Sequence, residues 1–320
     1  MKKTKTKVDL QTDKENKGFC HLMTERIEHF EKLGKKKTAD NYACALRHFI
    51  YFRGGKEIAI EDLSIGEMKD FQSYLIRKGI KMNTISLYNR ELRAVYHYAL
   101  DEEIIHTDRH PFRKSFTGRE KTRKRAINSN IVKRLTFLSL TDKQRLEFSR
   151  DLFLFSIYMQ GMSFVDIAHL KKNQIKNGWV TYQRRKTNRQ LKVKIHPQAQ
   201  VIIDKYHIND SDCPYLFPIL YNSSKKKWRK YSSALRIYNK HLNRLSVLLK
   251  LDEPLTSYVS RHTWASLARQ CCTNDMVICE AMGHSNVEIT TIYLASLDTE
   301  IVAMANLQII TSLLEKKRNS

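Results

Sequence analysis

The amino-acid sequence predicts a mainly α-helical protein with a small β-hairpin or sheet, divided into two domains. Over residues 19–105, apolar side chains recur at every third or fourth position, which is the spacing of amphipathic helices. Residues 179–182 and 191–195 are short runs of aromatic, β-branched and alternating apolar residues, which predict two strands. A strongly basic stretch lies between these two regions, and it predicts a domain boundary.

The first domain is expected to span residues 18–106 and to contain four helices joined by short turns. Thr38 is the expected N-cap of the second helix, because a threonine hydroxyl can accept a hydrogen bond from a free backbone N–H. The third helix is expected to follow Ser64 and to end at Gly79, and the fourth to cover residues 84–100.

Two segments outside the domains are basic. Residues 1–17 are charged and polar, so we expect a basic, disordered N-terminus. Residues 107–127 form the expected linker, which Pro111 and Gly118 punctuate. Within it, residues 113–125 are rich in lysine and arginine and contain the single acid Glu120. The pattern predicts a flexible, solvated tether that can also follow a phosphate backbone.

The second domain is expected to cover residues 128–320. Ser129 or Asn130 is the expected N-cap of its first helix, which runs to about Leu138. The other elements expected here are helices over residues 144–160, 235–249 and 299–314, a turn near Thr187 and Asn188, and a basic loop over 225–230.

The composition indicates a polyanionic partner. The formal net charge is +24, which exceeds what solubility requires and favours nucleic acid as the partner. An anionic membrane surface would also attract this charge, but the sequence shows no amphipathic anchor for one. No apolar run approaches the length of a membrane span, and the lysine-rich N-terminus lacks the apolar core of a secretory signal. We therefore expect a cytoplasmic protein without a membrane partner.

The cysteine pattern argues against a metal centre. The chain has six cysteines but no Cys-x-x-Cys pair, so a zinc site or a disulfide framework is not expected, and a reducing cytoplasm fits. The sequence also shows no cluster of carboxylates that could hold a metal ion. We expect neither a metal nor another cofactor.

Residues 256–293 carry the strongest chemical signal. Arg261 offers a planar fork for two phosphate oxygens, His284 can move protons near neutral pH, and the hydroxyl of Tyr293 can attack phosphorus. Thr256 or Ser257 is expected to cap a helix that runs to about Arg269. The other helix signals here are a cap at Thr273 or Asn274, a C-terminal turn at Gly283, and a capping box at Ser285 and Glu288.

Three ordered fragments then identify a resemblance: Arg261-His-Thr, Gly283-His284-Ser285 and Thr291-Ile-Tyr293. Their order and spacing resemble the C-terminal motifs of the tyrosine recombinase (phage integrase) family. The resemblance implies an N-terminal helical core-binding (SAM-like) domain, which binds DNA, and a C-terminal integrase-type catalytic domain. It implies that Tyr293 is the nucleophile, that Arg261 binds the scissile phosphate and that His284 assists phosphoryl transfer.

The family also has a lysine on a β-hairpin, which acts as general acid for the leaving 5′ hydroxyl, and Lys186 matches it. Asp166 matches the acid of the first motif, although Ser163-x-x-Asp166 also fits a simple capping box. Ser163 itself stands where the family usually has an arginine. Our hypothesis is that Arg184 replaces it, because residues two apart on an extended strand project to one face, here Arg184 with Lys186.

A second departure is Tyr258, which stands where the family commonly has histidine. A tyrosine hydroxyl can donate a hydrogen bond to a phosphate oxygen but is a poorer proton carrier at neutral pH. First motifs of the Gly-Met-Ser-Phe-Val-Asp type resemble those of integrases on bacterial mobile elements. Such a protein would act at the bacterial nucleoid, as a homo-tetramer on two duplex DNA sites, with accessory DNA-bending proteins as further partners. The helix over 299–314 would pack between protomers or on its own domain.

The resemblance implies strand exchange through a 3′-phosphotyrosyl link, without ATP or a redox cofactor. Three other functions stay open at this point. One is a catalytically impaired DNA-binding regulator, favoured by Ser163 and Tyr258, and another is a type IB topoisomerase-like activity. The third is generic RNA binding, which only the charge supports.

Overall fold

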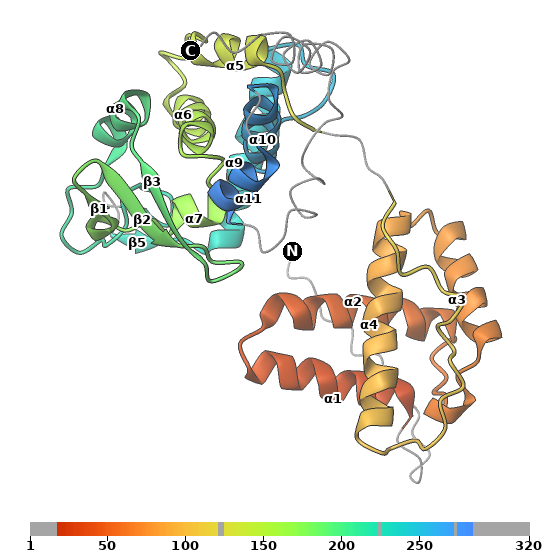
Figure 1. The fold of residues 1–320 in the computed structure, drawn as a ribbon. Coiled ribbons are helices and arrows are strands. Elements are labelled where there is room, and N and C mark those ends of the chain that lie inside the picture. The colour runs from red at the N-terminus through yellow and green to blue at the C-terminus, as the bar shows by residue number, and fades with distance from the viewer. Residues whose placement is uncertain (1–17, 121–124, 223–225, 272–273, 284–320) are drawn as a thin grey trace, which may run out of the picture. The chain divides into compact units, whose positions relative to one another are not determined.

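The structure is a computed structural model that describes residues 18–120, 125–222, 226–271 and 274–283 (Figure 1). The chain divides into two compact units, Met1–Thr122 and Arg123–Ser320. The predicted fold class is confirmed, since the described elements are mostly helices, with small antiparallel sheets in the second unit. Among these helices, none is both long enough and apolar enough to cross a membrane.

The first unit is a helical bundle. Its described elements are α1 (Phe19–Lys32), α2 (Lys36–Phe52), the 3-10 helix η1 (Ile60–Asp62), α3 (Ile65–Arg77) and α4 (Met82–Asp101). Helices α1 and α2 pack side by side, and α4 packs across both (Figure 1). The fully buried ring of Phe49 lies at the centre, 5.6 Å from the ring of Phe19 and 5.3 Å from that of Phe71, in edge-to-face geometry.

The helix ends of this unit can be compared with the starts and ends that the sequence predicted. Helix α3 begins directly after Ser64, as predicted, and the Ser64 hydroxyl caps it by accepting a hydrogen bond from the N–H of Glu67 at 3.1 Å. Gly79 follows α3 with a φ of +72°, a value that suits glycine. The prediction for Thr38 is wrong, because α2 begins two residues before it, after Lys35.

Part of the basic segment after α4 is attached to the first unit. Residues 116–120, which we expected to belong to a flexible tether, are hydrogen-bonded to side chains of α3 and α4.

The second unit combines helices with two small sheets. Its described elements are α5 (Ser129–Thr136), α6 (Gln144–Tyr158), α7 (Phe164–Ala168), η2 (Lys172–Gln174), β1 (Ile175–Lys176), β2 (Trp179–Gln183), β3 (Gln190–Lys194), α8 (Pro197–Tyr206), β4 (Tyr221–Asn222), β5 (Lys227–Trp228), α9 (Tyr231–Leu248), α10 (Val259–Gln270) and α11 (Asp275–Met282). The larger sheet has the antiparallel order β1-β2-β3, with Val180 opposite Val193, and β4 pairs with β5.

Helix α6 is the centre of this unit. It packs against α8, α9 and α10, so apolar side chains on all its sides are buried (Figure 1). Its Phe155 ring meets the ring of Phe217 edge to face at 5.1 Å, and nearby Phe164 stacks on Tyr238 at 4.1 Å. These contacts fix the C-terminal end of α6, which lies directly before the first motif, residues 161–166.

Several boundaries in this unit differ from expectation. The N-cap of α5 is Asn128, whose side chain accepts from the N–H of Ile131, and neither Ser129 nor Asn130 has this role. Helix α10 begins at Val259 after Tyr258, without a side-chain cap, so the expected caps at Thr256 or Ser257 are also wrong.

The caps around α11 follow expectation. The Asn274 side chain accepts from the N–H of Met276 at 2.7 Å, and Gly283 ends the helix with a φ of +61°. Helix α8 and strands β1, β4 and β5 were not anticipated; β5 lies inside the stretch expected to be a basic loop. The predicted disordered N-terminus, the capping box at Ser285 and the helix over 299–314 lie outside the described residues.

Candidate active site

Arg261 lies in the first turn of α10 and is 1% exposed. Its Nη1 donates to the carbonyl of Gly161 at 2.8 Å, and its Nη2 donates to the carbonyl of Met282. Burying a guanidinium is unfavourable unless its N–H groups are hydrogen-bonded, and these two carbonyls meet part of that need. The side chain is thereby held in one orientation.

The backbone around Arg261 is closely fitted to it. Gly161 has a φ of +68°, and a Cβ placed there would lie 3.2 Å from the Cα of Arg261 and 3.3 Å from its Cγ. The buried Ser156 hydroxyl donates to the Met162 carbonyl at 2.7 Å and lies 2.8 Å from the hydroxyl of Ser260. These contacts fasten the end of α6 to the start of α10.

Arg184 is the second buried arginine of the site, at 3% exposure. It directly follows β2, and its backbone N–H donates to the carbonyl of Arg189 at 2.8 Å across the hairpin. Its Nη1 donates to the Gly283 carbonyl at 2.8 Å, whereas its Nε has no hydrogen-bond partner among the described residues.

Arg184 and Arg261 therefore meet at the C-terminal end of α11. This end of a helix carries carbonyl groups that no later turn of the helix satisfies, together with a partial negative charge, and both favour cations. A Cβ at Gly283 would lie 3.4 Å from the Cδ of Arg184 and 3.1 Å from a methyl group of Leu191. Glycine allows this close approach, and His284 is the next residue in the chain.

Asp166 connects the first motif to the β2–β3 hairpin. One of its carboxylate oxygens accepts from the Ser163 hydroxyl at 2.6 Å, and the other accepts from the backbone N–H of Arg185 at 2.9 Å. Ser163 precedes α7 but its side chain makes no capping bond, so the alternative of a simple capping box is wrong. Asp166 instead holds the backbone of the turn that carries Lys186.

Lys186 lies in the exposed turn between β2 and β3, not in a strand. Strand β2 ends at Gln183, so the expected sharing of one strand face by Arg184 and Lys186 is wrong. Arg184 points into the unit toward Gly283, whereas Lys186 is exposed beside it. The two residues are close in sequence but lie in different environments.

Tyr258 and the two C-terminal candidates complete the predicted set. Tyr258 precedes α10, is 39% exposed and places its ring 5.5 Å from that of His262 in edge-to-face geometry. His284 and Tyr293 lie outside the described residues, so their predicted roles stay predictions. The described residues thus bring Arg184 and Arg261 together at the backbone carbonyls of Met282 and Gly283. His284 is the next residue in the chain.

Two tyrosines near Asp166 were not anticipated. Burial is the largest cause that raises the pKa of Tyr182; Asp166 raises it further, whereas Arg261 and Arg184 lower it. Burial and Asp166 together raise the pKa of Tyr231 to about 12. For Tyr182 the available signal was the alternation of Val180 and Tyr182 along β2, since every second residue of a strand faces the interior.

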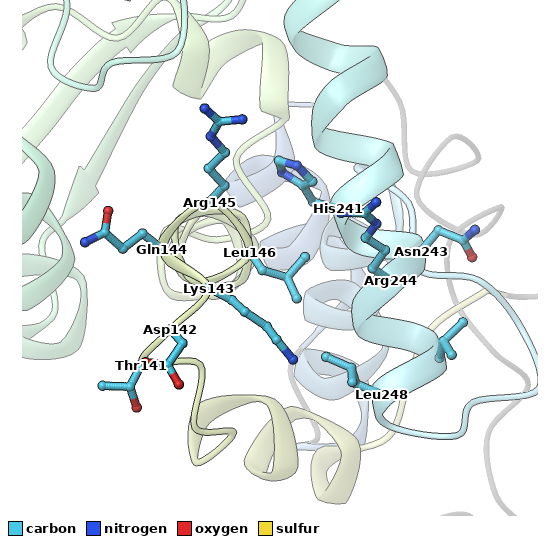
Figure 2. Close-up of a pocket in the computed structure, with 11 residues that line it drawn as sticks. Thr141, Asp142, Lys143, Gln144, Arg145, Leu146, His241, Asn243, Arg244 and Leu248 are labelled. Atoms are coloured by element: carbon cyan, nitrogen blue, oxygen red, sulfur yellow. The ribbon is translucent and has the colours of Figure 1, made fainter. Parts of the chain in front are cut away.

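A hollow of the second unit lies away from the candidate site residues. This hollow of about 930 Å³ lies between the N-terminal end of α6 and the C-terminal half of α9, and none of the candidate residues lines it (Figure 2). Lys143, Arg145, His241 and Arg244 lie around it. Among the described residues, no cluster of His, Cys, Asp and Glu could hold a metal ion.

Family models match both units. The model of the phage integrase SAM-like domain matches residues 18–117, and the model of the phage integrase family matches residues 127–300. The second match alone covers more than half of the chain.

The chain belongs to the phage integrase family.

Solved structures of tyrosine recombinases share the fold of this integrase-family chain. A structure of the Tn1549 transposon integrase in complex with transposon right end DNA has a TM-score of 0.69 and 15% identity, covering 92% of this chain and 99% of that one. A lambda integrase dimer bound to a COC' core site has a TM-score of 0.65 and 15% identity, with coverages of 85% and 93%.

A lambda integrase tetramer bound to a Holliday junction has a TM-score of 0.64 and 17% identity, covering 86% of this chain and 77% of that one. No curated protein matched the chain. At these identities the likeness establishes the fold, and the family models establish the family.

Proposed function

We propose that this chain is a site-specific DNA recombinase that cuts and rejoins duplex DNA through a 3′-phosphotyrosyl intermediate. The observation that carries the proposal is the meeting of two buried guanidinium groups, Arg184 and Arg261, at the carbonyls just before His284. Arranged guanidiniums in a partly dry site stabilise charge that develops on a phosphate far better than they would in water.

In the proposed first step, the Tyr293 hydroxyl oxygen attacks the scissile phosphorus and loses its proton. The bond from phosphorus to the 5′ oxygen breaks, and Lys186 gives that oxygen a proton. In the second step, a 5′ hydroxyl of the partner duplex attacks the same phosphorus and releases Tyr293. Each step exchanges one phosphodiester for another, so the reaction requires no nucleotide hydrolysis.

Arg261 and Arg184 would each hold a non-bridging oxygen of the phosphate, and His284 would assist proton movement. In this proposal Arg184 supplies the cation that the family usually has at the position of Ser163. Its Nε without a described partner, and its carbonyl contact that an incoming phosphate would replace, support the assignment. Asp166 would position the Lys186 turn, and Tyr258 would donate a hydrogen bond to the phosphate.

We further propose that the working assembly is a homo-tetramer on two DNA sites. The name of one lambda integrase structure gives a tetramer bound to a Holliday junction for that protein. Residues 299–314 are the proposed contact between protomers. Deletion of the chain after Asp298 should abolish tetramers on DNA but leave the fold intact. Tetramers formed by the deletion variant would contradict this assignment.

The experiment that tests the proposal is capture of a covalent protein–DNA adduct. A nicked duplex that carries the recognised site should trap the adduct with the parental protein, and Tyr293→Phe should form none. An adduct that persists in Tyr293→Phe would refute the nucleophile. If the protein binds DNA from the ends of a mobile element but forms no adduct on it, the alternative of a DNA-binding regulator is favoured instead.

A further inference from the structure

The backbone of residues 116–120 is bound by polar side chains on one face of α4. The Asn83 amide donates to the carbonyl of Glu120 at 3.0 Å and accepts from the N–H of Glu120 at 2.9 Å. The buried Ser86 hydroxyl donates to the carbonyl of Gly118 at 2.7 Å. These three contacts use no side chain of the bound segment.

The start of the segment is held by a second group. Asn89, which is fully buried, donates its amide to the carbonyl of Phe116 at 3.0 Å and to Gln72 of α3 at 3.2 Å. Gln72 in turn accepts from the N–H of Phe116 at 2.8 Å.

The spacing of the side chains on α4 matches the spacing of the backbone groups of residues 116–120. Asn83, Ser86 and Asn89 are three residues apart, which places them on one face of a helix. They bind Glu120, Gly118 and Phe116, which are two residues apart, as an extended segment presents its backbone. This geometry fixes where the segment lies and in which register.

The far end of the linker is anchored on the second unit. The N–H of Ile127 donates to the hydroxyl of Thr263 at 3.1 Å, and Thr263 is fully buried in α10, two residues after Arg261. Seven Cα–Cα steps separate Glu120 from Ile127. These two α-carbons can therefore be at most about 25 Å apart, since an extended chain spans about 3.6 Å per residue.

We propose that Asn83, Ser86, Asn89 and Gln72 are positioning residues that set the working length of the linker between the two units. The proposal rests on the proposed function, in which both units bind one duplex. If the contacts to Gly118 and Glu120 were released while Phe116 stayed bound, the linker would gain four residues, or about 14 Å of reach. The bound segment therefore limits which DNA contacts the two units can make together.

The first test is amide hydrogen exchange on the full-length protein. In the parental chain, the amide of Glu120 should exchange slowly and that of Arg119, which has no described acceptor, rapidly. The double variant Asn83→Ala/Ser86→Ala should expose Glu120 to exchange about tenfold faster, because the amide loses its acceptor. Ser73→Ala, which alters an exposed position on α3, is the matched control and should change nothing.

The second test asks whether the bound segment acts by setting the length of the linker between the two units. Deletion of Thr122 and Ala126 shortens the linker by about 7 Å without removing a charge. In the parental background this deletion should weaken binding to a duplex of about 40 base pairs by about 100-fold, because one unit can no longer bind with the other. In the Asn83→Ala/Ser86→Ala background, the released residues 117–120 should replace the lost length. The affinity of the shortened protein for the duplex should then be at least about tenfold higher than in the parental background.

A purely structural role of these side chains predicts no such rescue. Equal weakening by the deletion in both backgrounds, or no weakening in either, would overturn the proposal, as would rapid exchange of the Glu120 amide in the parental protein. The proposed recombinase function is tested separately by the Tyr293-dependent adduct. An adduct without the rescue would therefore reject only the linker inference.

Discussion

Arg184 and Arg261 donate hydrogen bonds to the carbonyls of two consecutive residues, Gly283 and Met282. The arginines come from a hairpin and a helix that are 77 positions apart in the chain. Their meeting at the C-terminal end of α11 places two guanidinium groups together, and in the proposed function one phosphate would accept hydrogen bonds from both and compensate both charges.

Arg184→Ala should lower the rate of adduct formation by about 10²- to 10³-fold, because one fixed charge on the phosphate is lost. Single-turnover cleavage of a nicked substrate measures this rate. Arg185→Ala is the matched control, since it removes an equal charge from the neighbouring exposed position. Cleavage by Arg184→Ala at the parental rate would exclude the proposed replacement of the first-motif arginine.

Gly283→Ala should destabilise the second unit and impair cleavage. The positive φ costs a residue with a side chain about 1–2 kcal/mol, and the new Cβ would also press on Leu191 and Arg184. Gly178→Ala is the control, because Gly178 has a φ of +75° with nothing within 4 Å of its Cβ position. Thermal unfolding should show a larger loss for Gly283→Ala, and equal losses would remove the argument for close packing.

Lys186→Ala should slow cleavage of an ordinary substrate by about 10²- to 10⁴-fold if the lysine protonates the leaving oxygen. A substrate with sulfur at the 5′ bridging position needs no such proton, so the variant should cleave it at nearly the parental rate. Lys192→Ala, an exposed lysine of β3, should cleave both substrates normally. A similar loss on both substrates would assign Lys186 to phosphate binding instead.

Stability should fall as the pH drops below about 6.5, through partly buried histidines such as His241. Burial lowers the pKa of His241, and Arg244, Arg145 and Lys240 lower it further, while its ring lies 2.8 Å from the Ser149 hydroxyl. Since the folded pKa is below the unfolded one, the unfolded chain binds more protons in this range. The stability is therefore complete above the unfolded pKa and is lost as the pH falls through the folded one.

Denaturant unfolding of the parental protein and of His241→Gln, at pH values between about 7.5 and 5.5, measures this effect. The variant should show the shallower dependence on pH, because it lacks one of the groups that bind a proton on unfolding. An unchanged dependence would show that His241 contributes nothing to it.

Local signals were strongest where one short segment decides the outcome. The start of α3 after Ser64, the Asn274 cap and the glycine turn at Gly283 depend on neighbouring residues only, so the sequence predicted them correctly. Thr38 shows the limit of the same rule, because packing of α2 on α1 extends the helix past a residue that could have capped it. The short strands β4 and β5 depend on pairing with each other, which no local pattern announces.

The sequence by itself determined the family, the helical character of both units and the residue types of the candidate site, because ordered motifs and helical periodicity are properties of the chain. Only the tertiary structure decided that Arg184 is buried with Arg261 at the end of α11 while Lys186 is exposed. It also decided that residues 116–120 are bound along α4. Both outcomes depend on side chains meeting backbone groups far away in the chain, and such contacts form only when the whole unit packs.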